Sequence, residues 1–173
     1  MPLSDFGSHD PDFSAEQVAE CARIVDGVRA INTKVVRLSG SVEDLTAAAD
    51  AIEALSASLD AVTKHRAMET FRYRFDSDKP NNVMPFNPAT GAFNPMAPKL
   101  EMKLESDKLV AEFAFPGNYE SAPDTVQGGM VAACFDQLLA FTVMAHGKTG
   151  PTVSLTVNFV KRTPINQLLR FEG

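Results

Sequence analysis

The feature that most constrains this chain is an almost entirely apolar run from Gly128 to Ala145, which contains one charged residue, Asp136. The run is long enough to approach a membrane span. However, an acid at the centre of a span costs roughly 2.5–3.5 kcal/mol on insertion scales, and no basic residue flanks the run on its N-terminal side. The run is therefore predicted to be the buried central helix of a globular domain, and no membrane span is expected.

The composition is that of an ordinary globular protein, with 45% hydrophobic and 22% charged residues among 173. A net charge of −6 gives no sequence-wide attraction to nucleic acid, so no nucleic-acid partner is expected. Cys21 and Cys134 lie far apart, and neither has the spacing of a zinc site, so we expect no disulfide and no metal. The N-terminus lacks the regions of a signal peptide, which indicates a cytoplasmic protein.

Residues 1–75 are predicted to form a tail and a helical hairpin, with a short strand-like alternation at 71–75. Ser14 and Gln17 have the spacing of a capping box, and a second helix is predicted to begin at Ser41. Apolar residues three or four positions apart place one stripe along each helix. We expect the hairpin to pack against the main domain or a partner subunit, and a protein-recognition module is the alternative.

Residues 76–98 are predicted to be a linker, because prolines and Asn-Pro pairs interrupt any regular element there. Alternating apolar residues then predict two strands, at 100–105 and 109–115, that form a hairpin before the apolar helix. A β-branched run at 152–160 and the residues from Leu168 to Phe171 predict two further strands.

Strands on both sides of one apolar helix indicate an α+β domain, in which an antiparallel sheet wraps around a central helix. This domain is predicted to occupy residues 99–173. The strands in the sequence would cover the helix only in part, so we expect either a partner chain or further strands beyond Gly173. The second is preferred, which makes this a C-terminally truncated domain.

Asp136 is the unusual residue in the apolar helix, because an unpaired buried charge costs several kcal/mol. One explanation is structural: the carboxylate accepts hydrogen bonds at a helix interface or lies at an exposed edge. The other is functional: it lines a pocket as a general base or nucleophile. The sequence pattern by itself leaves both explanations open.

Gly128 and Gly129 favour the functional explanation, because they leave backbone N–H groups unobstructed at the helix start, where an oxyanion or phosphate can bind. Helix geometry places Asp136 about 12 Å along the axis from Gly128 and about 80° around it. That is too far for both to act on one carbonyl within one chain. If both are catalytic, the site must combine the helix start of one chain with the acid of a second, which predicts an obligatory dimer.

Several motifs occur in order along residues 93–173: an Asn-Pro-x-x-Pro approach at 94–98, a Tyr-Glu pair at 119–120, the segment Gln127 to Asp136, and a Thr/Ser-rich stretch ending in an Arg-x-Pro-like corner at 153–164. Together they resemble the PaaI-like hotdog-fold acyl-CoA thioesterases. Members of that family commonly have His-Gly-Gly at the start of the central helix, with an acid nine residues after the His. The resemblance does not extend to residues 14–70.

The resemblance implies roles for individual residues. Asp136 would activate water or attack the thioester carbonyl directly, and the Gly128 N–H would stabilise the oxyanion, a contact worth about 3–4 kcal/mol in other enzymes. Ser154 matches a position that helps to orient water in some relatives. Lys161 and Arg162 lie where relatives place basic residues near the phosphates of coenzyme A, although a solvated strand end explains these two equally well.

Gln127 stands where the family has its His, beside Gly128 and the substrate-binding Gly129. A glutamine can donate a similar hydrogen bond to the carbonyl but cannot shuttle a proton. Asp124 also replaces a common glycine, so a different turn is expected in the loop before the helix.

Three functions follow from the sequence. The first is an acyl-CoA thioesterase that works without a cofactor, as a homodimer or a dimer of dimers (a homotetramer). The second is a non-catalytic hotdog module that binds acyl-CoA or a partner protein. A hydratase or dehydratase is disfavoured, because such sites generally rely on a His paired with the acid.

Overall fold

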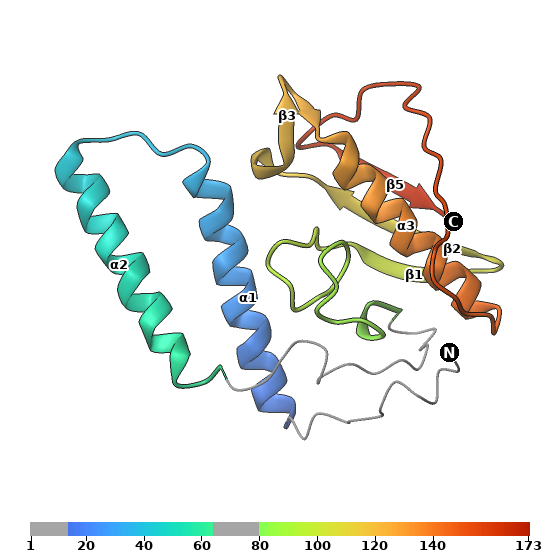
Figure 1. Cartoon of the computed structure of the whole chain (residues 1–173), viewed down its shortest axis with the longest axis horizontal. Coiled ribbons are helices and arrows are strands. Elements are labelled where there is room, and N and C mark those ends of the chain that lie inside the picture. The colour runs from blue at the N-terminus through green and yellow to red at the C-terminus, as the bar shows by residue number, and fades with distance from the viewer. Residues whose placement is uncertain (1–13, 64–79) are drawn as a thin grey trace.

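The computed structural model describes residues 14–63 and 80–173. Helices α1 (Ala15–Val35) and α2 (Val42–Asp60) run in opposite directions; α1 stands beside a sheet and helix α3 (Gly128–Ala145), and α2 lies on the far side of α1 (Figure 1). The predicted helix starts are confirmed: Ser14 and Gln17 form a capping box, and the Ser41 side chain caps α2. The predicted strand at 71–75 lies outside the described residues.

The main sheet has three antiparallel strands in the order β1-β2-β5. Strands β1 (Glu101–Glu105) and β2 (Lys108–Ala114) form the predicted hairpin, and β5 (Leu168–Glu172) pairs with the other edge of β2. After β2, a 3-10 turn, η4 (Gly117–Tyr119), leads into two short strands that pair with each other, β3 (Glu120–Ala122) and β4 (Thr125–Val126). Helix α3 begins directly after β4.

Helix α3 packs against β2 and β5 with one face only. Its buried residues are Val131, Cys134, Gln137, Leu138 and Phe141. The apolar ones share the core with Ala111 of β2, with Phe115 directly after β2, and with Phe171 of β5. By length and composition α3 could also cross a membrane, a property that it shares with core helices of soluble proteins. This sheet covers a single face of α3, so the strands present cover the helix only in part, as the sequence predicts.

The predicted strand at 152–160 is also wrong. This segment belongs to no strand, and its side chains are exposed apart from the half-buried Val157. β-Branched residues favour extended backbone, but a strand forms only where a neighbouring strand offers its edge. Within the described residues, no backbone hydrogen bond joins 152–160 to such an edge.

Residues 80–98 are irregular, as predicted, apart from the 3-10 turn η3 (Pro80–Asn82). They are nevertheless packed into the domain, and Val83 belongs to the hydrophobic core. The Asn81 side chain donates to the carbonyl of Leu100 (2.6 Å) and accepts the N–H of Met102 (3.0 Å). Side-chain amides therefore replace regular secondary structure in holding this proline-rich stretch on the sheet.

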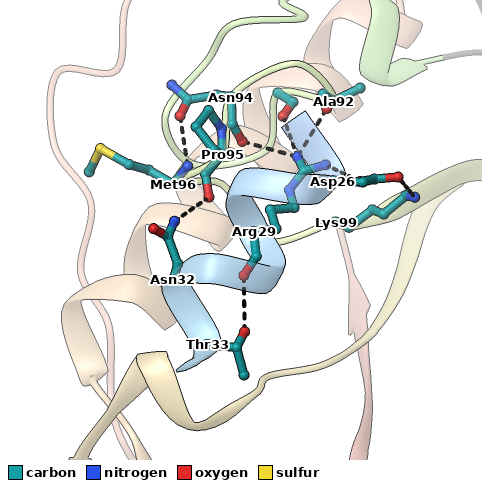
Figure 2. Close-up of polar contacts among 10 residues, drawn as sticks. Asp26, Arg29, Asn32, Thr33, Ala92, Asn94, Pro95, Met96 and Lys99 are labelled. Carbon is teal, nitrogen blue, oxygen red and sulfur yellow. Dashed lines mark hydrogen bonds and ion pairs between the residues drawn. The ribbon is translucent and has the colours of Figure 1, made fainter. Parts of the chain in front are cut away.

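Helix α1 is joined to this stretch by Arg29 (Figure 2). The guanidinium donates to the carbonyls of Gly91, Ala92 and Asn94 at 3.3, 3.0 and 3.0 Å, and forms an ion pair with Asp26 at 2.9 Å. The planar group has enough donors to serve several acceptors at once. The expected packing of the hairpin against the main domain is therefore found for α1.

Candidate active site

Gln127 is the N-cap of α3. Its Oε1 accepts the backbone N–H of Met130 at 2.8 Å, and its own N–H donates to the Tyr119 carbonyl at 2.8 Å. A Cβ at Gly129 would lie 2.8 Å from this Oε1, so a side chain there would displace the capping oxygen. The side-chain oxygen of Gln127 is thus occupied by the helix, which leaves its NH₂ group as the part that can face a ligand.

Gly128 is the first residue of α3, and Phe159 lies directly against it. A Cβ at position 128 would be 3.2 Å from the Phe159 ring, which explains the glycine by close approach. In the described part of the chain, the N–H groups of Gly128 and Gly129 have no hydrogen-bond acceptor. Two unpaired donors at the positive end of a helix dipole are suited to a negatively charged oxygen.

A cavity of about 390 Å³ opens at this helix start. Its lining residues are Thr125, Val126, Gly128, Phe159, Val160, Lys161, Arg162 and Thr163. The backbone N–H of Val126 donates to the Thr163 carbonyl at 2.8 Å, which ties the two walls together. The structure therefore brings three of the predicted site residues, Gly128, Lys161 and Arg162, to one cavity.

Asp136 does not line this cavity. It is half-buried, on the face of α3 opposite the sheet. The small and apolar residues that share this open face at helical spacing are Ala132, Ala133, Leu139, Ala140 and Val143. Leu139 and Val143 are 41% and 47% exposed. The only acid of α3 thus stands at the centre of an uncovered apolar face.

Ser154 is exposed and lies in the unpaired segment 152–160. It does not line this cavity and belongs to no strand. Its expected position, facing the site from a third strand, is not found because that strand does not form. Asp124 has a φ of 57°, the left-handed conformation that glycine adopts without cost. Its N–H donates to Glu120 Oε1 at 2.6 Å, so the loop keeps a glycine-like turn despite the substitution.

Sequence reasoning missed a buried polar pair next to Asp136. Gln137, which is 8% exposed, accepts a hydrogen bond from Asn87 Nδ2 at 2.7 Å. Asn87 Oδ1 in turn accepts the backbone N–H groups of Ala89 and Thr90, so the pair holds the loop on α3. The sequence offered one signal for this pair, a glutamine inside an apolar run. Nothing in the local sequence around Asn87, fifty positions earlier, indicated that it is the partner.

Phe159 was missed as well, because its place over Gly128 depends on the path of 151–163. Cys134 is fully buried, and burial raises the pKa of its thiol to about 12. Among residues 14–63 and 80–173, no group of three or more His, Cys, Asp or Glu side chains could hold a metal ion.

No protein-family model matches the sequence, and no curated protein matches it. The structure is similar to the crystal structure of a thioesterase superfamily protein, with a TM-score of 0.75 and 21% sequence identity. The similarity covers 95% of this chain and 77% of that chain. Because nearly the whole chain is matched at this low identity, the likeness concerns the fold. The chain therefore has the hotdog fold that its sequence predicts, preceded by a helical extension.

Proposed function

We propose that this protein is an acyl-CoA thioesterase in which Asp136 is the general base or nucleophile and the Gly128 N–H binds the oxyanion. The observation that carries the proposal is the open face of α3, where a half-buried acid stands among small and apolar side chains. A structural acid would be expected to accept hydrogen bonds, but among the described residues Asp136 has no hydrogen-bond or ion-pair partner.

The cavity beside Gly128 supports a thioester substrate. Its lining offers the backbone N–H of Gly128, which has no acceptor among the described residues, and two cations, Lys161 and Arg162. Such an arrangement suits a ligand with both a reacting carbonyl and a phosphate group. The NH₂ group of Gln127 is a further donor at the same helix start.

Hydrolysis requires a water oxygen to attack the carbonyl carbon while Asp136 accepts the proton. The resulting oxyanion accepts the N–H of Gly128, the C–S bond breaks, and the thiol leaves with the proton. In the alternative, the carboxylate itself attacks, and water cleaves the mixed anhydride that forms.

The site is completed by a second copy. Along one helix Asp136 is about 12 Å from Gly128, so one carbonyl cannot contact both within one chain. We therefore place the substrate between the α3 helix start of one copy and the open α3 face of its partner, in a homodimer or a dimer of dimers.

The test is thiol release from a panel of acyl-CoAs. We expect Asp136→Asn to lower kcat by about 10²- to 10⁴-fold, while Asp50→Asn on the exposed helix α2 leaves kcat unchanged. Gly128→Pro removes the donor at a helix position that tolerates proline. It should lower kcat by about 10²- to 10³-fold, whereas Gly128→Ala retains the N–H. Equal activity in the wild type and Asp136→Asn would contradict the proposal.

Mixing the two inactive variants tests the shared site. Asp136→Asn and Gly128→Pro chains, unfolded and refolded together, should regain activity, because one of the two sites in a mixed dimer contains both native groups. Failure to regain any activity, with mixed dimers present, would place both groups in one chain.

A non-catalytic acyl-CoA-binding module is the second candidate. The capping role of the Gln127 side-chain oxygen favours it, since no residue at this helix start can transfer a proton. Tight binding of acyl-CoA without thiol release at any chain length would establish this function instead.

A further inference from the structure

The side chain of Phe159 lies at the start of α3, and the packing of the fold does not explain it. The residue is 58% exposed and is not part of the hydrophobic core. Its ring nevertheless approaches Gly128 closely, because a Cβ at that glycine would lie 3.2, 3.3 and 3.7 Å from the ring atoms Cζ, Cε1 and Cε2. These atoms form the outer end of the ring, so Phe159 points its tip at Gly128.

The contact lies on the same side of Gly128 as its N–H. In a helix, the Cα–Cβ bonds tilt toward the N-terminus, and the N–H groups of the first turn point out of that end. The N–H of Gly128 has no acceptor among residues 14–63 and 80–173. A developing oxyanion that accepts it would lie about 2.7–3.1 Å from the nitrogen. The tip of Phe159 therefore borders the space that the rest of the carbonyl group must occupy.

The side chain of Gln127 borders the neighbouring position. A Cβ at Gly129 would lie 2.8 Å from Gln127 Oε1 and 3.2 Å from its Nε2. The amide is held in place, because Oε1 accepts the N–H of Met130 at 2.8 Å. A carbonyl bound at this helix start is therefore confined by an aromatic ring next to Gly128 and by an amide next to Gly129.

The chain that carries Phe159 is fixed to the domain a few residues later. The Thr163 carbonyl accepts the N–H of Val126 in β4, and the N–H of Asn166 donates to the Phe115 carbonyl, both at 2.8 Å. Phe159 and Gly128 also line the same cavity. A ligand that reaches the N–H of Gly128 through this cavity must therefore pass the ring.

The shape of a thioester determines which of its parts meets the ring. Its oxygen, sulfur and α-carbon lie in one plane with the carbonyl carbon. The sulfur carries the same CH₂ group in every coenzyme A thioester, so the α-carbon is the adjoining part that varies between substrates. An unbranched chain can continue in the plane, whereas a second carbon on the α-carbon projects out of it.

We propose that Phe159 is a specificity-determining residue that restricts the site to acyl groups without a branch at the α-carbon. The inference rests on the proposed thioester hydrolysis, for which it names the substrate class. The ring tip beside Gly128 takes the space that an out-of-plane methyl group requires.

Two isomeric substrates test this role. Butyryl-CoA and isobutyryl-CoA have the same number of carbons and differ in the α-branch, and hexanoyl-CoA with 2-methylpentanoyl-CoA forms a longer pair. In the wild type, kcat/KM should favour the straight chain by on the order of 10- to 100-fold, the range in which a pocket discriminates one methylene group. Phe159→Ala should reduce this ratio to about threefold or less, by raising kcat/KM for the branched isomer.

Val153→Ala is the matched control. Val153 lies in the same segment, is 96% exposed and does not line the cavity, so the ratio should remain that of the wild type. An equal ratio for the wild type and Phe159→Ala would overturn the inference, as would a wild type that treats the two isomers alike.

A different outcome identifies failure of the proposed function. If the wild type releases no thiol from any acyl-CoA, hydrolysis is refuted, and the Kd values of the two isomers are compared by isothermal titration calorimetry. Weaker binding of the branched isomer that Phe159→Ala relieves would retain the role of Phe159 in a binding module. Equal Kd values, or no binding of either isomer, would overturn that role as well.

Discussion

The two faces of helix α3 differ in what their residues do. One face buries Cys134, Leu138 and Phe141 against the sheet, and none of these is more than 1% exposed. The other leaves Leu139 and Val143 more than two-fifths exposed around Asp136. If α3 were buried on every side, Asp136 would not lie at the centre of a face that the sheet leaves uncovered. The difference indicates that one face provides the stability of the fold, and the other is the face on which we propose that a partner and a substrate bind.

The largest effect on stability is expected from truncating the buried face. Phe141→Ala should lower the free energy of unfolding by about 3–5 kcal/mol, because the fully buried ring leaves a cavity. Val143→Ala on the open face should change it by less than about 0.5 kcal/mol. Urea denaturation of both variants measures the contrast. Similar losses for the two would mean that both faces are covered in the isolated chain.

A smaller effect is expected at the polar pair on the edge of the buried face. Gln137→Ala leaves Asn87 without its partner and should cost about 1–3 kcal/mol. A double-mutant cycle with Asn87→Ala isolates the pair, and a coupling energy near zero would show that the loop at 84–90 is held by other contacts.

Cys134 provides a chemical measure of the buried face. Burial raises the pKa of its thiol to about 12, above the ordinary thiol value, so the folded state retains this proton at a pH where the unfolded state loses it. The contribution to stability is therefore present below the unfolded pKa and is lost as the pH rises toward the folded pKa. At pH 9, an aromatic disulfide reagent should modify Cys21 quickly and Cys134 only on unfolding. Fast modification of both thiols would show that this face opens.

The smallest effect on stability is expected at the centre of the open face. Leu139→Lys should leave the free energy of unfolding within about 0.5 kcal/mol of the wild type. It should nevertheless weaken self-association and thiol release, because it puts a charge where a second copy is proposed to pack. Sedimentation and activity measured together test this, and a variant with full activity as a stable monomer would refute the shared site.

Much of the fold could be predicted because its signals are local. Ser14 and Gln17 cap a helix through residues three apart, and the alternation around Met102 and Ala111 defines a hairpin joined by two residues. At the candidate site, the same holds for the helix start. Gly128 and Gly129 lie at a helix start, and their N–H groups are left without acceptors in the described structure.

The predictions that were wrong depended on contacts between distant residues. The run at 152–160 has the composition of a strand, but pairing requires an edge that its own sequence does not specify. The role that the family resemblance implies for Ser154 requires that strand, because only the strand would point its side chain toward the site. The loop at 80–98 is irregular, as its prolines predict, but that Asn81 and Asn87 bind it to the sheet and to α3 could not be foreseen from the local sequence.

The sequence by itself determined that an apolar helix begins at Gly128, carries one acid and is flanked by strands, since these properties depend on residues within a few turns of one another. Only the tertiary structure decided that α3 is covered on one side, that Phe159 lies over Gly128, and that Lys161 and Arg162 share its cavity. Those outcomes depend on which surfaces the remaining chain reaches. The one-sided sheet over α3 places Asp136 on an open face, one of the positions that the sequence left open.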